Sequence, residues 1–115
     1  MITLSEQQLI NLIQPDLPIR AYPQRQLLPN LRQQFPRETF TTKTELEIRS
    51  VMDMRDEGGV ICEVIPTGFD TKKAKAVVLC SITHLRIKKG EPHCAQIVRY
   101  QVKRMKKLAR QDPFH

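Results

Sequence analysis

The sequence is poor in aromatic residues: among 115 residues there is no Trp, and only 5% are aromatic. The core must therefore consist mainly of aliphatic side chains. A surface that stacks successive bases is disfavoured, because it would depend on Tyr22, Tyr100 and four Phe residues. No apolar run approaches the roughly 20 residues that cross a bilayer, and the opening "MITLSEQQ" lacks the basic and then apolar pattern of a signal peptide. These absences predict a cytoplasmic protein with no membrane partner.

Cysteine is scarce, and the common chemical motifs are missing. Cys62, Cys80 and Cys94 are odd in number and widely spaced, which favours buried thiols in a reducing compartment over a disulfide framework. No C-x-x-C pair accompanies His84 or His93, so no metal site is predicted. The motifs G-x-x-x-x-G-K-[ST], G-x-G-x-x-G and G-x-S-x-G are also missing. We therefore expect neither an enzyme nor a cofactor.

The net charge of +7 is unevenly distributed along the chain. Residues 1–41 hold 4 basic and 3 acidic groups, and residues 42–70 hold 3 basic and 7 acidic groups. Residues 71–115 hold 12 basic and 2 acidic groups, a local net charge of +10. Such polarity favours a polyanionic partner, although the acidic middle could also neutralise the basic end within one fold.

The first 41 residues predict a helix followed by a proline-rich arm. Ser5 and Gln8 can form a capping box, and Pro15 ends a helix over residues 1–14. Five of the eight prolines lie in residues 15–41, which excludes a long helix and predicts an extended arm lying on the domain. Within this arm, "NLRQQF" is expected to form a short helical turn.

From Thr42 the pattern changes to that of strands. Apolar and polar residues alternate over 42–54, with Leu46, Ile48, Ser50, Met52 and Met54 on one face. The turn "RDEGG" and the apolar "VICEVI" complete a hairpin. The stretch "AVVLCSITHLRI" is β-branched and apolar on both faces, which predicts one central strand. The strand at 42–54 would then be an exposed edge, and a homodimer would cover it.

Residues 92–111 predict an amphipathic helix with Pro92 in its first turn. At 100° per residue one apolar stripe forms, which we expect to pack on the sheet; its members are Cys94, Val98, Val102, Met105 and Ala109. Six basic residues are expected to share the outward half: Arg99, Lys103, Arg104, Lys106, Lys107 and Arg110. Three interpretations stay open: a polyanion-binding face, an ordinary solvated face, or a ligand for an acidic groove of another protein.

One further basic stretch, "GFDTKKAKAVV" at residues 68–78, resembles the G-x-S-K-K-x-A-K signature of double-stranded-RNA-binding domains. The resemblance implies that Lys72, Lys73 and Lys75 contact phosphates across an RNA groove. The stretch departs from the signature in the spacing of Lys73 and Ala74, and the residues after it have the composition of a strand instead of an alanine-rich helix. We therefore assign no family from it.

Together these patterns predict a single α+β domain over 1–115, in the order α-β-β-β-α. A three-stranded antiparallel sheet and the C-terminal helix would occupy residues 42–115. The expected function is non-catalytic binding of RNA, DNA or another polyanion. The alternative is a protein–protein adaptor or homo-oligomeric subunit that binds no nucleic acid.

Overall fold

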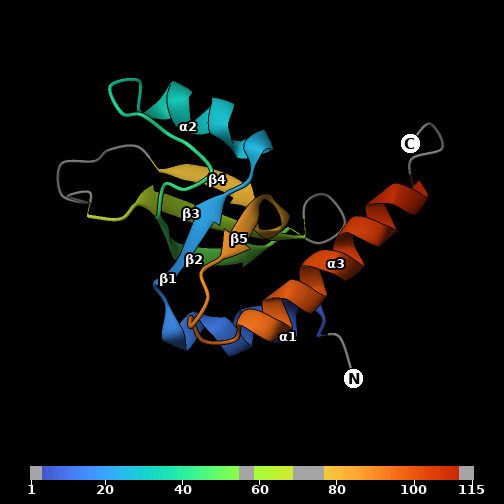
Figure 1. Cartoon of the computed structure of the whole chain (residues 1–115). Coiled ribbons are helices and arrows are strands. Elements are labelled where there is room, and N and C mark those ends of the chain that lie inside the picture. Colours follow the sequence, from blue (N-terminus) through green and yellow to red (C-terminus); the bar gives the residue numbers. More distant parts are fainter. Residues whose placement is uncertain (1–3, 55–58, 69–76, 112–115) are drawn as a thin grey trace.

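The computed structural model describes residues 4–54, 59–68 and 77–111, and shows an α+β fold built on a curled antiparallel sheet (Figure 1). Within these residues the α-helices are α1 (Glu6–Ile13), α2 (Leu28–Gln34) and α3 (Cys94–Gln111). The strands are β1 (Ile19–Pro23), β2 (Leu46–Asp53), β3 (Val60–Pro66), β4 (Val78–Ser81) and β5 (Leu85–Ile87). The α+β class and the C-terminal helix are confirmed. The prediction of three strands is wrong, since the sheet has five.

Helix α1 starts at the predicted capping box and ends next to Pro15, but it is shorter than the predicted range of 1–14, since Leu4 and Ser5 are not helical. The Ser5 hydroxyl accepts a hydrogen bond from the Gln8 amide at 3.2 Å, and the Gln8 side chain accepts one from the Ser5 amide at 3.0 Å. This reciprocal pair is the predicted capping box. Pro15 then lies in a 3-10 helix at Gln14–Asp16, directly after the last turn. The apolar side of α1 faces the core, where Leu9 and Ile13 are fully buried.

The strand order β4-β3-β2-β1-β5 places β2 in the centre of the sheet. Strand β2 pairs with β3 along its length and with β1 over Leu46–Ile48. The expected hairpin of residues 42–54 and "VICEVI" is confirmed, because β2 and β3 are antiparallel neighbours. The expectation that the first of these strands is an edge is wrong. The edges are β4 and β5, so the argument for a dimer built on β2 no longer applies.

Strand β1 comes from the proline-rich arm, where the sequence predicts only an extended connection. Its five residues pair with β2 on one side and with β5 on the other. Pro23 is tolerated because it stands at the last position of the strand, where the ladder ends. The arm is therefore ordered on the sheet, and α2 confirms the short helix expected at "NLRQQF".

A β-bulge in β2 changes which of its residues face the core. The register shifts between Ile48 and Ser50, so Arg49 is an extra residue on this strand. Because side chains alternate with period two, one extra residue moves every later side chain to the other face. Val51 is consequently buried, whereas Met52 is exposed. The predicted alternation is correct before the bulge and inverted after it.

The stretch "AVVLCSITHLRI" forms two edge strands instead of one central strand. The Ser81 hydroxyl accepts a hydrogen bond from the Thr83 amide at 3.2 Å and so begins a 3-10 helix at Ile82–His84. Strand β4 precedes this helix and β5 follows it, at opposite edges of the sheet. Three residues can connect the two edges because the sheet curls (Figure 1).

The core fills the inside of the curl and is mainly aliphatic, as the composition predicts. Its largest fully buried side chains come from every layer of the fold; they include Leu9, Ile19, Leu31, Ile48, Ile82 and Ile97. Helices α1 and α2 lie at opposite ends of the sheet (Figure 1). Phe35 and Phe40 close the α2 end, with ring centroids 5.9 Å apart.

Candidate binding site on the C-terminal helix

Helix α3 begins at Cys94, two residues later than predicted, because His93 adopts a left-handed conformation with φ of 64°. The His93 carbonyl accepts a hydrogen bond from the Ile97 amide at 3.0 Å. The His93 ring lies beside the segment that follows α1: its Nε2 is 2.6 Å from the Asp16 carboxylate. The start of α3 is thus tied to the segment that follows α1.

The face of α3 that packs on the protein is not the predicted apolar stripe. Val98, Val102 and Met105 are 44%, 49% and 50% exposed. The buried residues of the helix are instead Ile97, Tyr100 and Arg104. The prediction that the stripe packs on the sheet is therefore wrong by about a third of a turn around the helix, since successive residues are 100° apart.

Tyr100 anchors α3 to the β2–β3 hairpin and to α1. Its hydroxyl accepts a hydrogen bond from the Val60 amide at 3.2 Å and donates one to the Glu6 carboxylate at 3.4 Å. Burial raises the pKa of this hydroxyl, so it remains protonated and able to donate. Gly59 leaves room for it: with φ of 65°, a Cβ on Gly59 would stand 2.5 Å from the Tyr100 oxygen.

Gln101 ties the same side of α3 to the 3-10 helix at Ile82–His84. Its side-chain amide donates to the carbonyls of Ile82 and Leu85, both at 2.7 Å. These carbonyls lie where the chain leaves β4 and enters β5, so the ladder does not satisfy them. A polar residue therefore completes the hydrogen bonding of the turn and fixes the position of the helix.

Arg104 is not on the outward basic face where the sequence places it. It is 5% exposed and lies beside Gly59, just before β3, where its Nε would be 3.3 Å from a Cβ on Gly59. The aliphatic part of its side chain suits such a position. Arg104 is therefore a packing residue of α3, and we remove it from the candidate site.

The other five predicted residues of α3 lie together on its outer side. They border one open hollow on the helix surface, together with Val102; they are Arg99, Lys103, Lys106, Lys107 and Arg110. Arg99 is half-buried and the other four are exposed. The sequence of α3 contains no acidic residue, so no carboxylate of this helix neutralises the group. We call these five residues the basic face.

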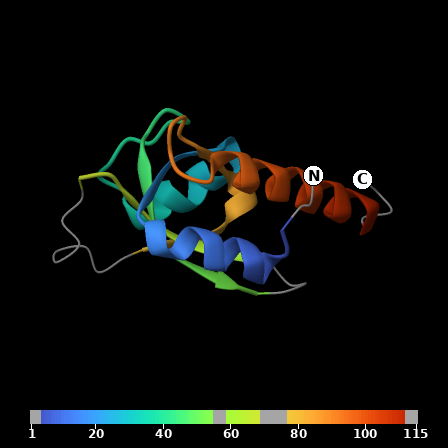
Figure 2. The ribbon, with the colours of Figure 1, turned by 90° about the horizontal axis from the view of Figure 1, so that it is seen from below.

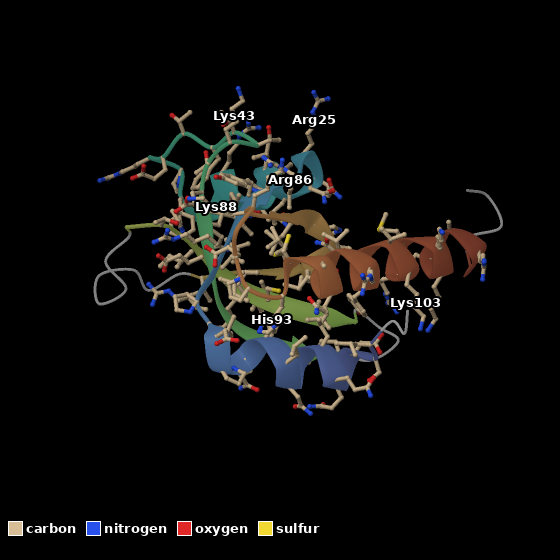
Figure 3. The ribbon with its side chains drawn as sticks, turned by 60° about the horizontal axis from the view of Figure 1, so that its bottom comes forward. Arg25, Lys43, Arg86, Lys88, His93 and Lys103 are labelled. Carbon is tan, nitrogen blue, oxygen red and sulfur yellow. The ribbon has the colours of Figure 1, made fainter. Side chains whose placement is uncertain are left out.

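Among the described residues, Arg86 and Lys88 do not extend this face. Lys72, Lys73 and Lys75 lie outside the described residues. Lys88 pairs with Glu45 at 2.7 Å, which raises the pKa of Lys88 and lowers that of Glu45. Arg86 stacks on the Tyr22 ring at 4.6 Å. Figure 3 shows Arg86 and Lys88 near Arg25 and Lys43, and Lys103 on α3 in another part of the molecule.

The cysteines and histidines form no metal site among the described residues, in which no group of three or more His, Cys, Asp or Glu could hold an ion. Of the three predicted buried thiols, Cys62 and Cys80 are buried and lie directly opposite each other on β3 and β4, whereas Cys94 is half-buried. Burial raises the pKa of Cys80 to about 12, and that of Cys62 well above its usual value. Both are therefore thiols and poor nucleophiles at neutral pH.

Sequence reasoning missed the exposed apolar side of α3. The signal that could have found it lies at Tyr100 and Gln101, which stand on the same side as Ile97 and can both hydrogen-bond to backbone: the Tyr100 hydroxyl accepts from the Val60 amide, and the Gln101 side chain donates to two carbonyls. Such residues suit a helix side that packs against backbone groups of neighbouring segments. The hydrophobicity of the stripe alone does not distinguish packing on the core from packing on a partner.

Comparison of the chain with protein-family models, curated proteins and solved structures gives no match. Function must therefore be argued from the site itself. In the part of the chain that the structure describes, none of the helices is long and apolar enough to span a bilayer.

Proposed function

We propose that the protein is a small non-catalytic binding protein that contacts RNA or DNA through the basic face of α3. The observation that carries the proposal is the hollow that Arg99, Lys103, Lys106, Lys107 and Arg110 border on one helix without acids. Positive side chains grouped in this way attract phosphates and release the counterions bound to them. Both Lys and Arg make phosphate contacts of this kind, which carry no base sequence information.

The shape of α3 supports this use. Figures 1 and 2 show its C-terminal half extending away from the sheet. Lys103 and Lys107 also border a hollow with Leu4 and Glu6 at the start of α1, so the far end of α3, toward Arg110, is the part most open to a long ligand. From Arg99 to Arg110 the helix rises about 16 Å, enough for several consecutive phosphates along a strand. The scarcity of aromatic side chains on this face argues for phosphate contact without base stacking.

The test is binding of mixed-sequence RNA and duplex DNA, measured by fluorescence anisotropy from about 50 mM to 200 mM salt. We expect the logarithm of affinity to fall linearly with the logarithm of salt concentration. In the triple variant Lys103→Ala, Lys106→Ala, Arg110→Ala, the slope on duplex DNA should decrease by about 2 to 3, because each lost phosphate contact removes nearly one unit.

A second triple variant, which loses the same net charge, tests whether the position of the lost charges matters for binding. Arg25→Ala, Arg37→Ala, Lys43→Ala removes three exposed positive charges elsewhere on the protein and should leave the salt slope nearly unchanged. Equal weakening by both triple variants would show that binding follows total charge instead of the basic face. No association at about 50 mM salt would overturn the proposal.

A further inference from the structure

Five apolar residues along one side of α3, four of them exposed and Ala109 half-buried, have the spacing of a coiled-coil seam. They are separated by alternate steps of three and four residues; they are Ala95, Val98, Val102, Met105 and Ala109. Steps that average 3.5 residues place side chains along one line that faces a partner helix. We call this line the α3 seam. Its three central residues are each at least 44% exposed, so no described part of this chain covers them.

The protein body forms a wall along one side of the seam. Gln24, Thr83 and Gln101 line a shallow groove together with Val102 and Met105 of the seam. The groove therefore has an apolar floor, contributed by α3, and a polar wall, contributed in part by the chain around β1 and the 3-10 helix. A rod-shaped ligand such as a helix fits beside such a wall, whereas a flat bilayer surface would touch its rim.

Basic residues flank the other side of the seam. Arg99 directly follows Val98, and Lys106 directly follows Met105. In a heptad the residues at these two positions flank the seam and contact the flanking residues of a partner helix. Since α3 contains no acid, a partner with Glu or Asp at the facing positions would complement both charges.

A second copy of this chain is a poor match for the same seam. In an antiparallel pair, Arg99 and Lys106 would face the same residues of the other copy and repel them. In a parallel pair they would face Gln101 and Leu108, which offer no negative charge. The net charge of +7 on each copy would add to the cost.

We infer that the α3 seam is the docking site for an amphipathic helix of another protein, with apolar residues at 3.5-residue spacing and acidic residues beside them. The site goes beyond nucleic-acid binding and does not depend on it. Lys103 and Arg110 lie further around α3 from the seam than Lys106, so a docked helix leaves them accessible.

The test uses a designed peptide of about four heptads with Leu at the seam positions and Glu at the flanking positions. Its matched control replaces each flanking Glu with Lys and keeps every Leu. Calorimetry with the full chain should show saturable binding of the Glu peptide and none of the Lys peptide. In the variant Val102→Gln, Met105→Gln, affinity for the Glu peptide should fall about tenfold or more, since apolar anchors contribute most of the energy of such contacts.

Because both substituted residues are exposed and Gln is a good helix former, this variant should keep the urea midpoint of the original chain. The control Lys103→Ala, Arg110→Ala should change peptide affinity less than about threefold while it weakens RNA binding. The inference is overturned if the two peptides bind equally or the Glu peptide does not bind. It is also overturned if light scattering shows that the seam pairs two copies, or if the Gln variant loses binding to anionic vesicles that the original chain has.

Discussion

The two halves of α3 differ in what holds them. In the first half Ile97 and Tyr100 are buried, as is Arg104 just past the midpoint, and Gln101 donates to the carbonyls of Ile82 and Leu85. In the second half every described side chain after Arg104 is exposed except that of Ala109, which is half-buried. An isolated helical segment of this length is marginal in water. Packing on a ligand would therefore stabilise the second half of α3. The two surfaces proposed for such packing are the basic face and the α3 seam.

The comparison also shows that hydrophobicity alone does not anchor this helix. Two of the three buried residues, Tyr100 and Arg104, are polar at their ends, and Gln101 is polar throughout. Tyr100 and Gln101 hold the helix because the neighbouring segments present backbone groups that need hydrogen-bond partners: the Val60 amide and the carbonyls of Ile82 and Leu85. Apart from Ile97, the large aliphatic residues of α3 are exposed: Val98, Val102, Met105 and Leu108.

The largest expected effect tests which side of α3 is buried. Ile97→Ala should lower the free energy of unfolding by about 3 kcal/mol, because it leaves a cavity at a fully buried position. Val102→Ala should change it by less than about 0.5 kcal/mol, since Val102 is 49% exposed. Urea denaturation of both variants gives the two values. Similar losses in the two variants would show that the seam is packed in the free protein.

A smaller effect is expected where Tyr100 of α3 approaches Gly59. Gly59→Ala should destabilise by about 2 kcal/mol or more, from the strain of a left-handed alanine and the displacement of the Tyr100 hydroxyl. Gly90→Ala is the matched control, because its φ is 92° but nothing lies within 4 Å of an added Cβ. Thermal or urea unfolding should rank Gly59→Ala as clearly worse. Equal costs would mean that the close approach of Tyr100 contributes nothing.

The smallest effect concerns pH and the 3-10 helix that accepts the hydrogen bonds of Gln101. Burial lowers the pKa of His84, so the unfolded chain binds the proton more readily than the folded one. Stability from this group is complete above the unfolded pKa of about 6.5 and is lost as the pH falls below it. Urea midpoints at pH 7 and pH 5 should therefore differ less in His84→Gln than in the original chain. Parallel changes in both proteins would contradict this.

Much of the local structure follows from short-range signals. The start of α1 could be predicted from Ser5 and Gln8, and the β2–β3 hairpin from the turn residues that precede Val60. Both features depend on neighbours within a few residues of the chain. The basic face was predictable in the same way, since five of its six proposed members share one side of a helix. Arg104 was the exception, because its burial depends on Gly59, 45 positions earlier in the chain.

The remaining errors arise from contacts that no local pattern encodes. Strand β1 exists because β2 and β5 pair with it on either side, not because "IRAYP" is a strong strand sequence. The bulge at Arg49 inverts the second half of β2 without any glycine to signal it. The exposure of the α3 seam could not be predicted for a related reason. An apolar stripe that packs on the core has the same composition as one that stays exposed.

The pairing of β1 with β5 also determines when the fold can be completed during synthesis. Gln24, which follows β1, bonds to Leu85 across 61 positions of the chain. Strand β1 has no partner on that side until almost the whole sheet has been translated, and Gln101 cannot secure the adjoining turn until later still. Such high contact order slows folding. The nascent chain therefore keeps one flank of β1 unpaired until the 61 positions that separate Gln24 from Leu85 have been synthesised, which is the interval in which a chaperone would have the most to protect.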